Sequence, residues 1–452
     1  MTPKSTLRFL SLAAASGVST LMAGPAAPVA PLPPPVDANP LSFFGGKLVL
    51  DFQERMRFEY RENNYDFNNS VDALTDDSWL LQRFRIGAKW SPLPWLSIYA
   101  QAQDTREFNS DRPNIIGTMG AEGNDRFDLR QGYIRLGDPK AISLTVGRQS
   151  MLYGDERLIG PLDWLNQGRT FDAVKFRYET KDWWVDAFAS SVVTFRDHQF
   201  NQSDWLSDSD IRDQIFSGIY FSTTMWGPQT TDLYALHLHE ENGGDTDFFT
   251  FGTRVKADLK KTGGLDYEAE LAVQTGEVKG RDLSAWAVHA GIGYVWLQHP
   301  WKPRVFVEYN YGTGDKNAAD GDTETFQNLF PTNHKFYGYM DFFSWQNLHN
   351  PAISFSIAPA KDITLRADGH LFWLADTSDA WYRANGVTMV RPINSAANSY
   401  VGAEIDLTAT WKPKKWLAVQ AGYSHFFAGD YPEATGASDD ADFAYTSVTI
   451  DF

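Results

Sequence analysis

The chain alternates apolar and polar residues over most of its length after residue 47. Successive side chains of a β-strand point to opposite faces, so this period of two predicts strands with one apolar and one polar face. The same period recurs at 173–180 and at 399–411. In the segment 47–60, the apolar set is Leu48, Leu50, Phe52, Met56, Phe58 and Tyr60, and the polar set is Asp51, Gln53, Arg55, Arg57 and Glu59.

This alternation, with the turn residues between the segments, predicts about 18 strands. An antiparallel sheet on a soluble core would alternate in the same way, so the period alone leaves two classes of all-β fold open. The predicted strands are 47–60, 79–90, 95–104, 127–136, 142–150, 173–180, 183–193, 214–224, 231–240, 248–260, 265–275, 284–297, 303–311, 351–358, 363–375, 399–411, 416–428 and 441–452.

The connections between these strands alternate between short and long. Outer-membrane barrels join their strands by short periplasmic turns and long extracellular loops, whereas a soluble sandwich has no reason to alternate. We therefore predict a transmembrane antiparallel up-and-down β-barrel with both termini in the periplasm. The short joints are 91–94, 137–141, 181–182, 225–230, 261–264, 298–302, 359–362 and 412–415, and the long ones are 61–78, 105–126, 151–172, 194–213, 241–247, 276–283, 312–350, 376–398 and 429–440.

Composition favours the membrane barrel. After residue 23 no run of 18 apolar residues occurs, which excludes a helical membrane protein. Aromatic residues make up 15% of the chain and include 16 Trp, and barrels place such residues in girdles at the two membrane interfaces. The tryptophans that flank the predicted short turns are Trp90, Trp95, Trp183, Trp184, Trp226, Trp296, Trp301, Trp411 and Trp416.

The N-terminal segment predicts export from the cytosol. Lys4 and Arg8 precede a run of small and apolar residues at 9–23, which is the pattern of a cleaved signal peptide; a membrane anchor is the alternative. We assign 1–23 to the signal peptide, 24–46 to a proline-rich periplasmic linker and 47–452 to the barrel. The chain has no Cys, so disulfides, thiolate chemistry and a lipoprotein anchor are excluded.

Charge and the C-terminus indicate the partners. The net charge of −17 argues against nucleic acid. The last strand ends at Phe452, with Val448 and Ile450 on the same parity, which resembles the signal read by barrel-assembly machinery. We predict localisation in the bacterial outer membrane, with membrane lipid and lipopolysaccharide as the surroundings.

The segment 147–172 carries a distinctive motif. Its residues are Gly147-Arg148-Gln149, Tyr153-Gly154-Asp155-Glu156-Arg157-Leu158 and Asp163-Trp164-Leu165-Asn166-Gln167-Gly168-Arg169-Thr170-Phe171-Asp172. This motif resembles the central motif of the alginate export porin family, and similar pieces are Gln131-Gly132-Tyr133-Ile134-Arg135, His334-Lys335-Phe336-Tyr337-Gly338-Tyr339-Met340-Asp341 and Asn347-Leu348. The resemblance extends over most of the chain after residue 47. It implies an 18-stranded barrel with an arginine-lined pore that lets polyanionic alginate cross the outer membrane.

Arginines on the polar strand faces and near this motif are the candidate pore residues. A guanidinium group is always charged and binds carboxylates through a planar fork, so a ring of them makes a path for anions. The alternative is that these arginines pair with Asp155, Asp163, Asp172 and Glu179 and brace the wall. The anion-path candidates are Arg55, Arg57, Arg83, Arg85, Arg135, Arg148, Arg157, Arg169, Asp172 and Arg177.

No pattern predicts an enzyme or a cofactor. The chain contains no G-x-S-x-G nucleophile elbow. His237 and His239 share a strand face, but no third zinc ligand is evident nearby, so we expect a solvated pore wall and no metal site. We predict an outer-membrane channel for anionic poly- or oligosaccharide. A general diffusion porin for small nutrients is the alternative, and an outer-membrane hydrolase is a third class.

Overall fold

The computed structural model places the barrel and the end of the N-terminal segment. The predicted signal peptide and residues 24–40 of the predicted linker lie outside the described residues. The last linker residues do not remain an extended spacer, because Ser42 and Phe43 pair with Val49 and Leu48 of the first barrel strand. The structure describes residues 41–71, 75–112, 122–196, 199–206, 213–241 and 244–452.

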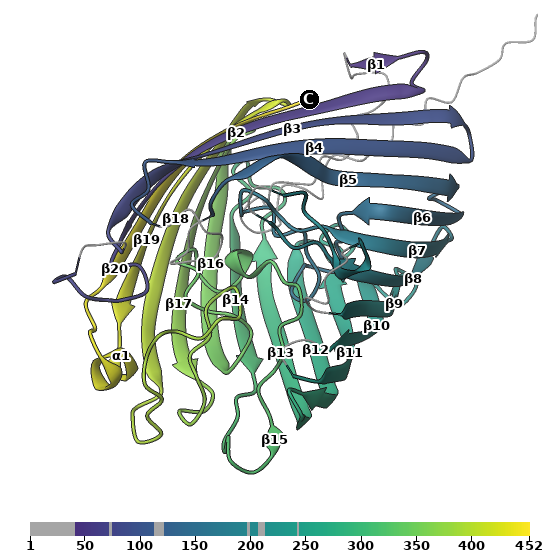
Figure 1. Cartoon of the computed structure of the whole chain (residues 1–452). Coiled ribbons are helices and arrows are strands. Elements are labelled where there is room, and N and C mark those ends of the chain that lie inside the picture. The colour runs from purple at the N-terminus through teal and green to yellow at the C-terminus, as the bar shows by residue number, and fades with distance from the viewer. Residues whose placement is uncertain (1–40, 72–74, 113–121, 197–198, 207–212, 242–243) are drawn as a thin grey trace, which may run out of the picture.

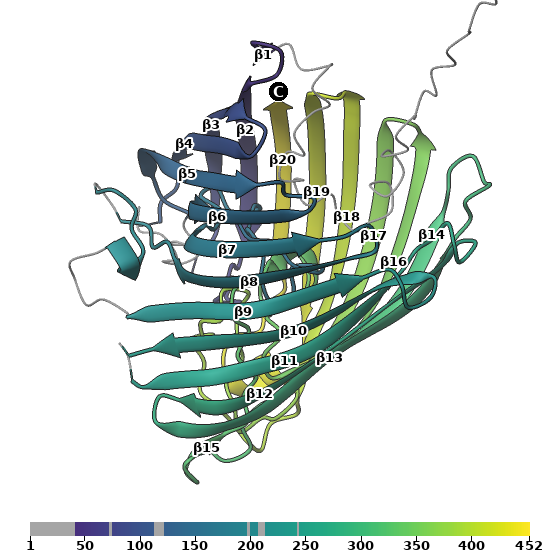
Figure 2. The same ribbon diagram turned by 90° about the vertical axis from the view of Figure 1, so that its right-hand side faces the viewer.

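Within the described residues, eighteen long antiparallel strands form one closed sheet, and two strands of two residues pair with ends of β2 and β13 (Figure 1). Figure 2 shows the strands tilted around the barrel. The strands are β1 (Ser42–Phe43), β2 (Leu48–Glu62), β3 (Asp77–Leu93), β4 (Leu96–Phe108), β5 (Asp125–Gly137), β6 (Ile142–Gln149), β7 (Phe171–Glu179), β8 (Trp183–Val192), β9 (Gln214–Thr223), β10 (Gln229–Glu240), β11 (Thr246–Ala257), β12 (Leu265–Val278), β13 (Arg281–Val295), β14 (Arg304–Gly312), β15 (Asp322–Thr323), β16 (Leu348–Ala360), β17 (Ile363–Leu374), β18 (Tyr400–Lys414), β19 (Leu417–Ala428) and β20 (Ala441–Asp451).

Closure joins the first long strand to the last. β2 pairs with β20 over ten residues of each strand, from Gln53 opposite Asp451 to Glu62 opposite Asp442. Phe452 continues the ladder by exchanging backbone hydrogen bonds with Phe52, at 2.9 and 3.1 Å. Closure leaves no open sheet edge, which lipid could not satisfy with hydrogen bonds.

The alternation of connections holds with two exceptions. The connection after β10, predicted to be long at 241–247, spans only 241–245 and is shorter than the connection after β11, which spans 258–264. The predicted long segment 276–283 is wrong, because β12 and β13 continue through it to a two-residue turn. The turn residues Lys279 and Gly280 have φ values of 53° and 75°, as a type I′ hairpin turn requires. The next connection, 296–303, was predicted to be short and is the longer of the two.

The outer face carries apolar side chains, and the tryptophan prediction holds except at one position. Trp90, Trp95 and Trp226 are each about half exposed on the outside near the short turns. Trp184 instead faces the lumen, where the guanidinium carbon of Arg177 lies 4.4 Å from its ring centroid.

The placement predicted for the two histidines is also wrong. Leu236 and Leu238 of β10 face inward, so His237 and His239 point away from the lumen. Both histidines are hydrogen-bonded to Asp247, at 2.9 Å each. They therefore belong to the outer face of the barrel and not to a pore wall.

Two long loops fold into the barrel and fill much of its interior. Loop 150–170 and loop 313–347 pair through a parallel bridge between Ile159 and Phe330, and the Gly160 amide donates to the Phe330 carbonyl oxygen at 2.9 Å. Figure 1 shows much of both segments inside the ring of strands, whereas the part of loop 313–347 that carries β15 extends beyond the strands. Their aromatic side chains pack against the inner wall. The ring centroid of Phe330, in loop 313–347, lies 5.3 Å from that of Phe171 in β7.

Helices are a minor component of the described residues. Those present are the 3-10 helices η2 (Asp204–Leu206) and η3 (Asn333–Lys335) and the short helix α1 (Asp430–Thr435) in the last long loop. None of these helices combines the length and the apolar character needed to cross a membrane. They stand in loops and leave the strands to build the wall.

Candidate functional site in the barrel lumen

The inner face of β2 to β7 is predominantly basic. The register sets Arg55 of β2 opposite Arg83 of β3, and Gln53 opposite Arg85, so guanidinium groups lie side by side on one face. Like charges placed directly opposite each other are unfavourable unless a counter-charge is close. We call this surface the basic wall; its lumen-facing cations are Arg55, Arg57, Arg61, Arg83, Arg85, Lys89, Arg130, Arg135, Lys175 and Arg177.

The counter-charge at the centre of the basic wall comes from loop 150–170. The Asp163 carboxylate accepts from Arg85 at 2.7 Å and is 3.3 Å from Arg83 and 3.5 Å from Arg130. Arg55 donates to the backbone carbonyl oxygen of Asp163 at 2.9 Å. Burial alone would raise the pKa of the Asp163 carboxyl, but the surrounding arginines outweigh burial and hold this pKa well below its usual range.

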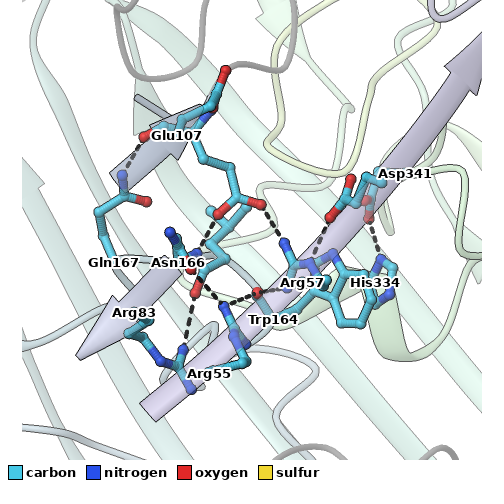
Figure 3. Close-up of polar contacts among 12 residues, drawn as sticks. Arg55, Arg57, Arg83, Glu107, Trp164, Asn166, Gln167, His334 and Asp341 are labelled. Carbon is cyan, nitrogen blue, oxygen red and sulfur yellow. Dashed lines mark hydrogen bonds and ion pairs between the residues drawn. The ribbon is translucent and has the colours of Figure 1, made fainter. Parts of the chain in front are cut away.

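The neighbouring residue, Trp164, extends this anchorage (Figure 3). Arg57 donates to the Trp164 carbonyl oxygen at 2.5 Å, and its guanidinium carbon lies 4.0 Å from the Trp164 ring centroid. Arg57 also pairs with Glu59 at 2.6 Å and Glu122 at 2.5 Å. A cation over an aromatic ring and two carboxylates fix this guanidinium group in one position.

Loop 313–347 is attached to the same cluster. The His334 ring stacks on Trp164 with a centroid separation of 3.9 Å, and its Nδ1 is 2.9 Å from the Asp341 carboxylate. Asp341 is in turn 3.5 Å from Arg61. Figure 3 shows His334 and Asp341 beside Trp164 and Arg57. The two loops and the basic wall therefore form one connected polar network.

The remaining candidate residues lie apart from this centre. Arg148 and Asp172 form a buried pair with N–O distances of 3.0 and 3.1 Å. Arg157, in loop 150–170, points away from the basic wall and contacts Asn310 of β14 and Tyr337 of loop 313–347. Arg169 donates to the carbonyl oxygens of Gly160 and Pro331, Arg177 pairs with Asp186 and Glu179, and Arg135 contacts Thr145.

The predicted candidates therefore divide into two groups. Arg55, Arg57, Arg83 and Arg85 are nearly fully buried under the loops, as expected if arginines brace the wall. Arg135 and Arg177 stay partly accessible in the lumen. The anion path itself remains a prediction.

The inner face of β8 to β18 has the opposite character. We call it the acidic wall. Several of its carboxylates are paired with cations of the same wall: Arg254 pairs with Asp232 at 3.1 Å and with Glu268 at 2.6 Å. Its lumen-facing carboxylates are Asp186, Asp232, Asp266, Glu268, Glu270, Glu308, Asp368, Glu404 and Asp406.

A small cavity of about 80 Å³ lies between the acidic wall and the infolded loops. Its charged lining contains basic and acidic groups in equal number: Asp155, Arg157, Lys256, Glu268, Arg304, Glu308, Lys335, Arg366, Asp368 and Asp406. Most of these are paired with one another, as Lys335 is with Asp155 at 2.8 Å. The cavity surface is therefore close to neutral, in contrast to the basic wall.

Sequence reasoning missed Arg130 and the acidic wall. Arg130 sits at a β-bulge, where Leu129 pairs with Ala102 and Gln131 with Gln101, so simple parity does not place it. The acidic wall could have been predicted, because Asp266, Glu268 and Glu270 occupy every second position of β12 and the residues between them are apolar or aromatic.

Comparisons with known proteins agree on a transport channel. The fold matches crystal structures of Pseudomonas aeruginosa outer-membrane proteins: OpdF in complex with glucuronate at a TM-score of 0.59 and 10% identity, covering 90% of this chain and 98% of that one. OpdK with vanillate matches at a TM-score of 0.58 and 10% identity, covering 89% and 98%. OpdO matches at 0.59 and 12% identity, covering 90% and 97%. No curated protein sequence matches the chain.

These matches show the barrel fold of the porin type, and barrels of this type have long extracellular loops and short periplasmic turns. The family and fold are those of channels and not of enzymes. The family model described as "Alginate export" matches residues 47–445. The protein is thus an outer-membrane channel, and the chain belongs to the alginate export family.

Proposed function

We propose that this channel passes saccharides that carry carboxylate groups, along the basic wall. The observation that carries the proposal is the convergence of four arginines from three strands on Asp163 and its carbonyl oxygen. Guanidinium groups arranged in this way match the planar geometry of carboxylates. The basic wall is therefore built to bind a carboxylate.

The bound carboxylate belongs to a loop and not to the wall. Asp163 belongs to the loop between β6 and β7, whereas the arginines belong to β2, β3 and β5. The arginines therefore stay on the wall if the loop moves. A substrate carboxylate that displaces Asp163 meets the same donors. In this account, loop 150–170 closes the path and the substrate competes with it.

The comparison with OpdF supports the same class of solute. That protein was crystallised with glucuronate, a sugar acid. At 10% identity the likeness concerns the fold, so the class of solute is carried here by the arginine cluster.

A general diffusion porin is the second candidate, and the cavity favours it. The cavity at the acidic wall is lined by balanced charges and would admit polar solutes without preference for anions. The two candidates differ in which wall the solute follows.

Uptake into liposomes distinguishes them. Purified channel in liposomes should pass galacturonate faster than galactose, and Arg83→Gln with Arg85→Gln should reduce that preference. Lys412→Gln, which removes an exposed charge from β18, outside the basic wall, serves as the control. Equal rates for both sugars in the wild type would support the diffusion porin and overturn the anion path.

A further inference from the structure

Cations of the basic wall differ in whether the protein supplies their counter-charge. Arg83, Arg85 and Arg130 share the Asp163 carboxylate, and Arg57 has two carboxylates. Toward the short-turn end of the wall, Arg177 still pairs with Asp186 and Glu179, but two other cations of the described chain lack such a partner. Among the described residues, Lys89 and Arg135 form no ion pair with a carboxylate.

We propose that Lys89, Arg135 and Lys175, together with Tyr99 and Tyr133, bind oligomers of acidic sugars at the periplasmic mouth. We call this group the mouth patch. The inference rests on the proposed function and adds a second binding site, separate from Asp163, together with the size of the ligand that it takes.

The register gathers these residues on one face. Lys89 of β3 lies opposite Tyr99 of β4, which lies opposite Tyr133 of β5. Arg135 lies opposite Thr145 of β6, and Thr145 opposite Lys175 of β7. The strands that carry the cations all run toward the short turns, which follow β3, β5 and β7.

The cations are accessible and only weakly held. Lys89 and Arg135 are each half-buried in the lumen wall. The Arg135 Nε donates to the Thr145 hydroxyl at 3.2 Å, and its guanidinium carbon lies 5.4 Å from the Tyr133 ring centroid. Lys175 is 4.0 Å from Asp186, whose carboxylate is already held by Arg177 at 2.6 Å.

The Asp51 carboxylate, on the same part of the wall, is directed elsewhere. Asp51 accepts hydrogen bonds from Tyr99 at 3.0 Å and from Gln101 at 2.9 Å. Half-buried cations without a close carboxylate lose hydration that the protein does not replace. An anion from solution would supply the missing charge-assisted hydrogen bonds.

The tyrosines suit a sugar ring. The ring centroids of Tyr99 and Tyr133 lie 5.3 Å apart between the cation-bearing positions, and both rings are partly accessible. An aromatic ring offers a flat apolar face, against which the C–H face of a sugar packs while its carboxylate reaches a neighbouring cation. An inorganic anion would use the cations and leave these faces empty.

The width of the mouth patch selects for oligomers. Neighbouring strands are about 4.8 Å apart, so the strands that carry Lys89 and Lys175 are separated by roughly 20 Å. A single carboxylate cannot satisfy cations spread over this width. A chain of acidic sugars presents several carboxylates in sequence, and therefore fits the patch better than a monomer does.

Blockade of single channels tests the mouth patch. Tetragalacturonate added to the chamber facing the short turns should block the current at about tenfold lower concentration than galacturonate does. Lys89→Gln with Arg135→Gln should weaken that block about tenfold, which corresponds to about 1.4 kcal/mol. Lys412→Gln is the matched control, because it removes one exposed charge at the same end of the barrel from another strand.

The chain has no Cys, so one introduced thiol reports orientation. Val390 is 96% exposed in the long loop after β17, and a bulky impermeant maleimide should label Val390→Cys only from the long-loop chamber. Heat-dependent migration on gels checks that each variant is folded. Block of equal strength from both chambers, or a double variant that behaves like Lys412→Gln, overturns the mouth patch. Faster uptake of galactose than of galacturonate in the liposome experiment would instead overturn the proposed function.

Discussion

The basic wall and the acidic wall of this barrel neutralise their charges in different ways. On the acidic wall, paired cations and carboxylates both belong to strands of the barrel, as where Arg254 of β11 is 2.6 Å from Glu268 of the adjacent β12. On the basic wall, the central counter-charge is Asp163, which belongs to a loop. The electrostatics of the acidic wall are therefore fixed by the barrel, whereas those of the basic wall depend on the position of loop 150–170.

This difference assigns separate tasks to the two halves. A wall whose charges are paired within the sheet contributes to the rigidity of the barrel. A wall whose arginines are neutralised by a loop becomes strongly positive when that loop leaves. Substitutions in the two walls should therefore have different consequences, the first on barrel stability and the second on the pore.

The largest effect on stability is expected on the acidic wall. Arg254→Gln leaves the buried carboxylates of Asp232 and Glu268 without their shared partner, and breaking a buried ion pair in this way costs about 3–5 kcal/mol. The variant should unfold at a lower denaturant concentration. Gly154 of loop 150–170 lies beside Arg254, but the part of the loop around Asp163 should keep its wild-type hydrogen exchange. Loosening around Asp163 in this variant would contradict the separation of the two walls.

A smaller effect, located in the loop, is expected from Asp163→Asn. The amide keeps some hydrogen bonds but loses the charge that Arg83, Arg85 and Arg130 share, at a cost of about 2–3 kcal/mol in docking free energy. Hydrogen exchange of 150–170 should accelerate while barrel unfolding changes little. Unchanged protection of the loop would show that Asp163 does not hold it.

Trp164→Leu should weaken the junction between the two loops by about 1–2 kcal/mol. The substitution removes the ring under Arg57 and the stacking partner of His334. Both loops should exchange faster, and loop 150–170 should remain anchored through Asp163. If only one loop responds, the two loops are not coupled through this ring.

The smallest effect is expected from pH. The pKa of Asp163 is lower in the docked loop than in a free carboxyl, whose value is about 3.9. The contribution of this carboxylate to docking is fully present above that value and is lost as the pH falls through the lowered pKa. Hydrogen exchange of the loop, corrected for its intrinsic pH dependence, should show no change in docking between about pH 8 and pH 5. A transition within that range would mean that another group controls the loop.

The sequence carried enough information for the barrel but not for its interior. Alternation along 47–60 and 399–411 predicted strands that the structure contains, because a strand in lipid must present an apolar side chain at every second position. The prediction of a long loop at 276–283 was wrong, because Lys279 and Gly280 make a tight turn and the polar residues on either side of it belong to strands.

The interior depends on contacts between residues far apart in the chain. Arg83 meets Asp163 across 80 residues, and Arg61 donates to the Met340 carbonyl oxygen across 279. Neither the period of a strand nor the length of a loop indicates that the loop folds inward. The sequence therefore named Arg83 and Asp163 as candidates, without showing that a loop carboxylate would lie on the arginine cluster.

The most direct test of this account is the reversal potential of the channel in a planar bilayer with a salt gradient, measured for the wild type and for Asp163→Asn. Low-dielectric walls focus the field of the arginines, while charges of distant loops are screened within about 10 Å at 0.1 M salt. The account predicts anion preference in the wild type, despite the net charge of −17, with larger conductance and stronger anion preference in the variant. A cation-selective channel that Asp163→Asn leaves unchanged would contradict it.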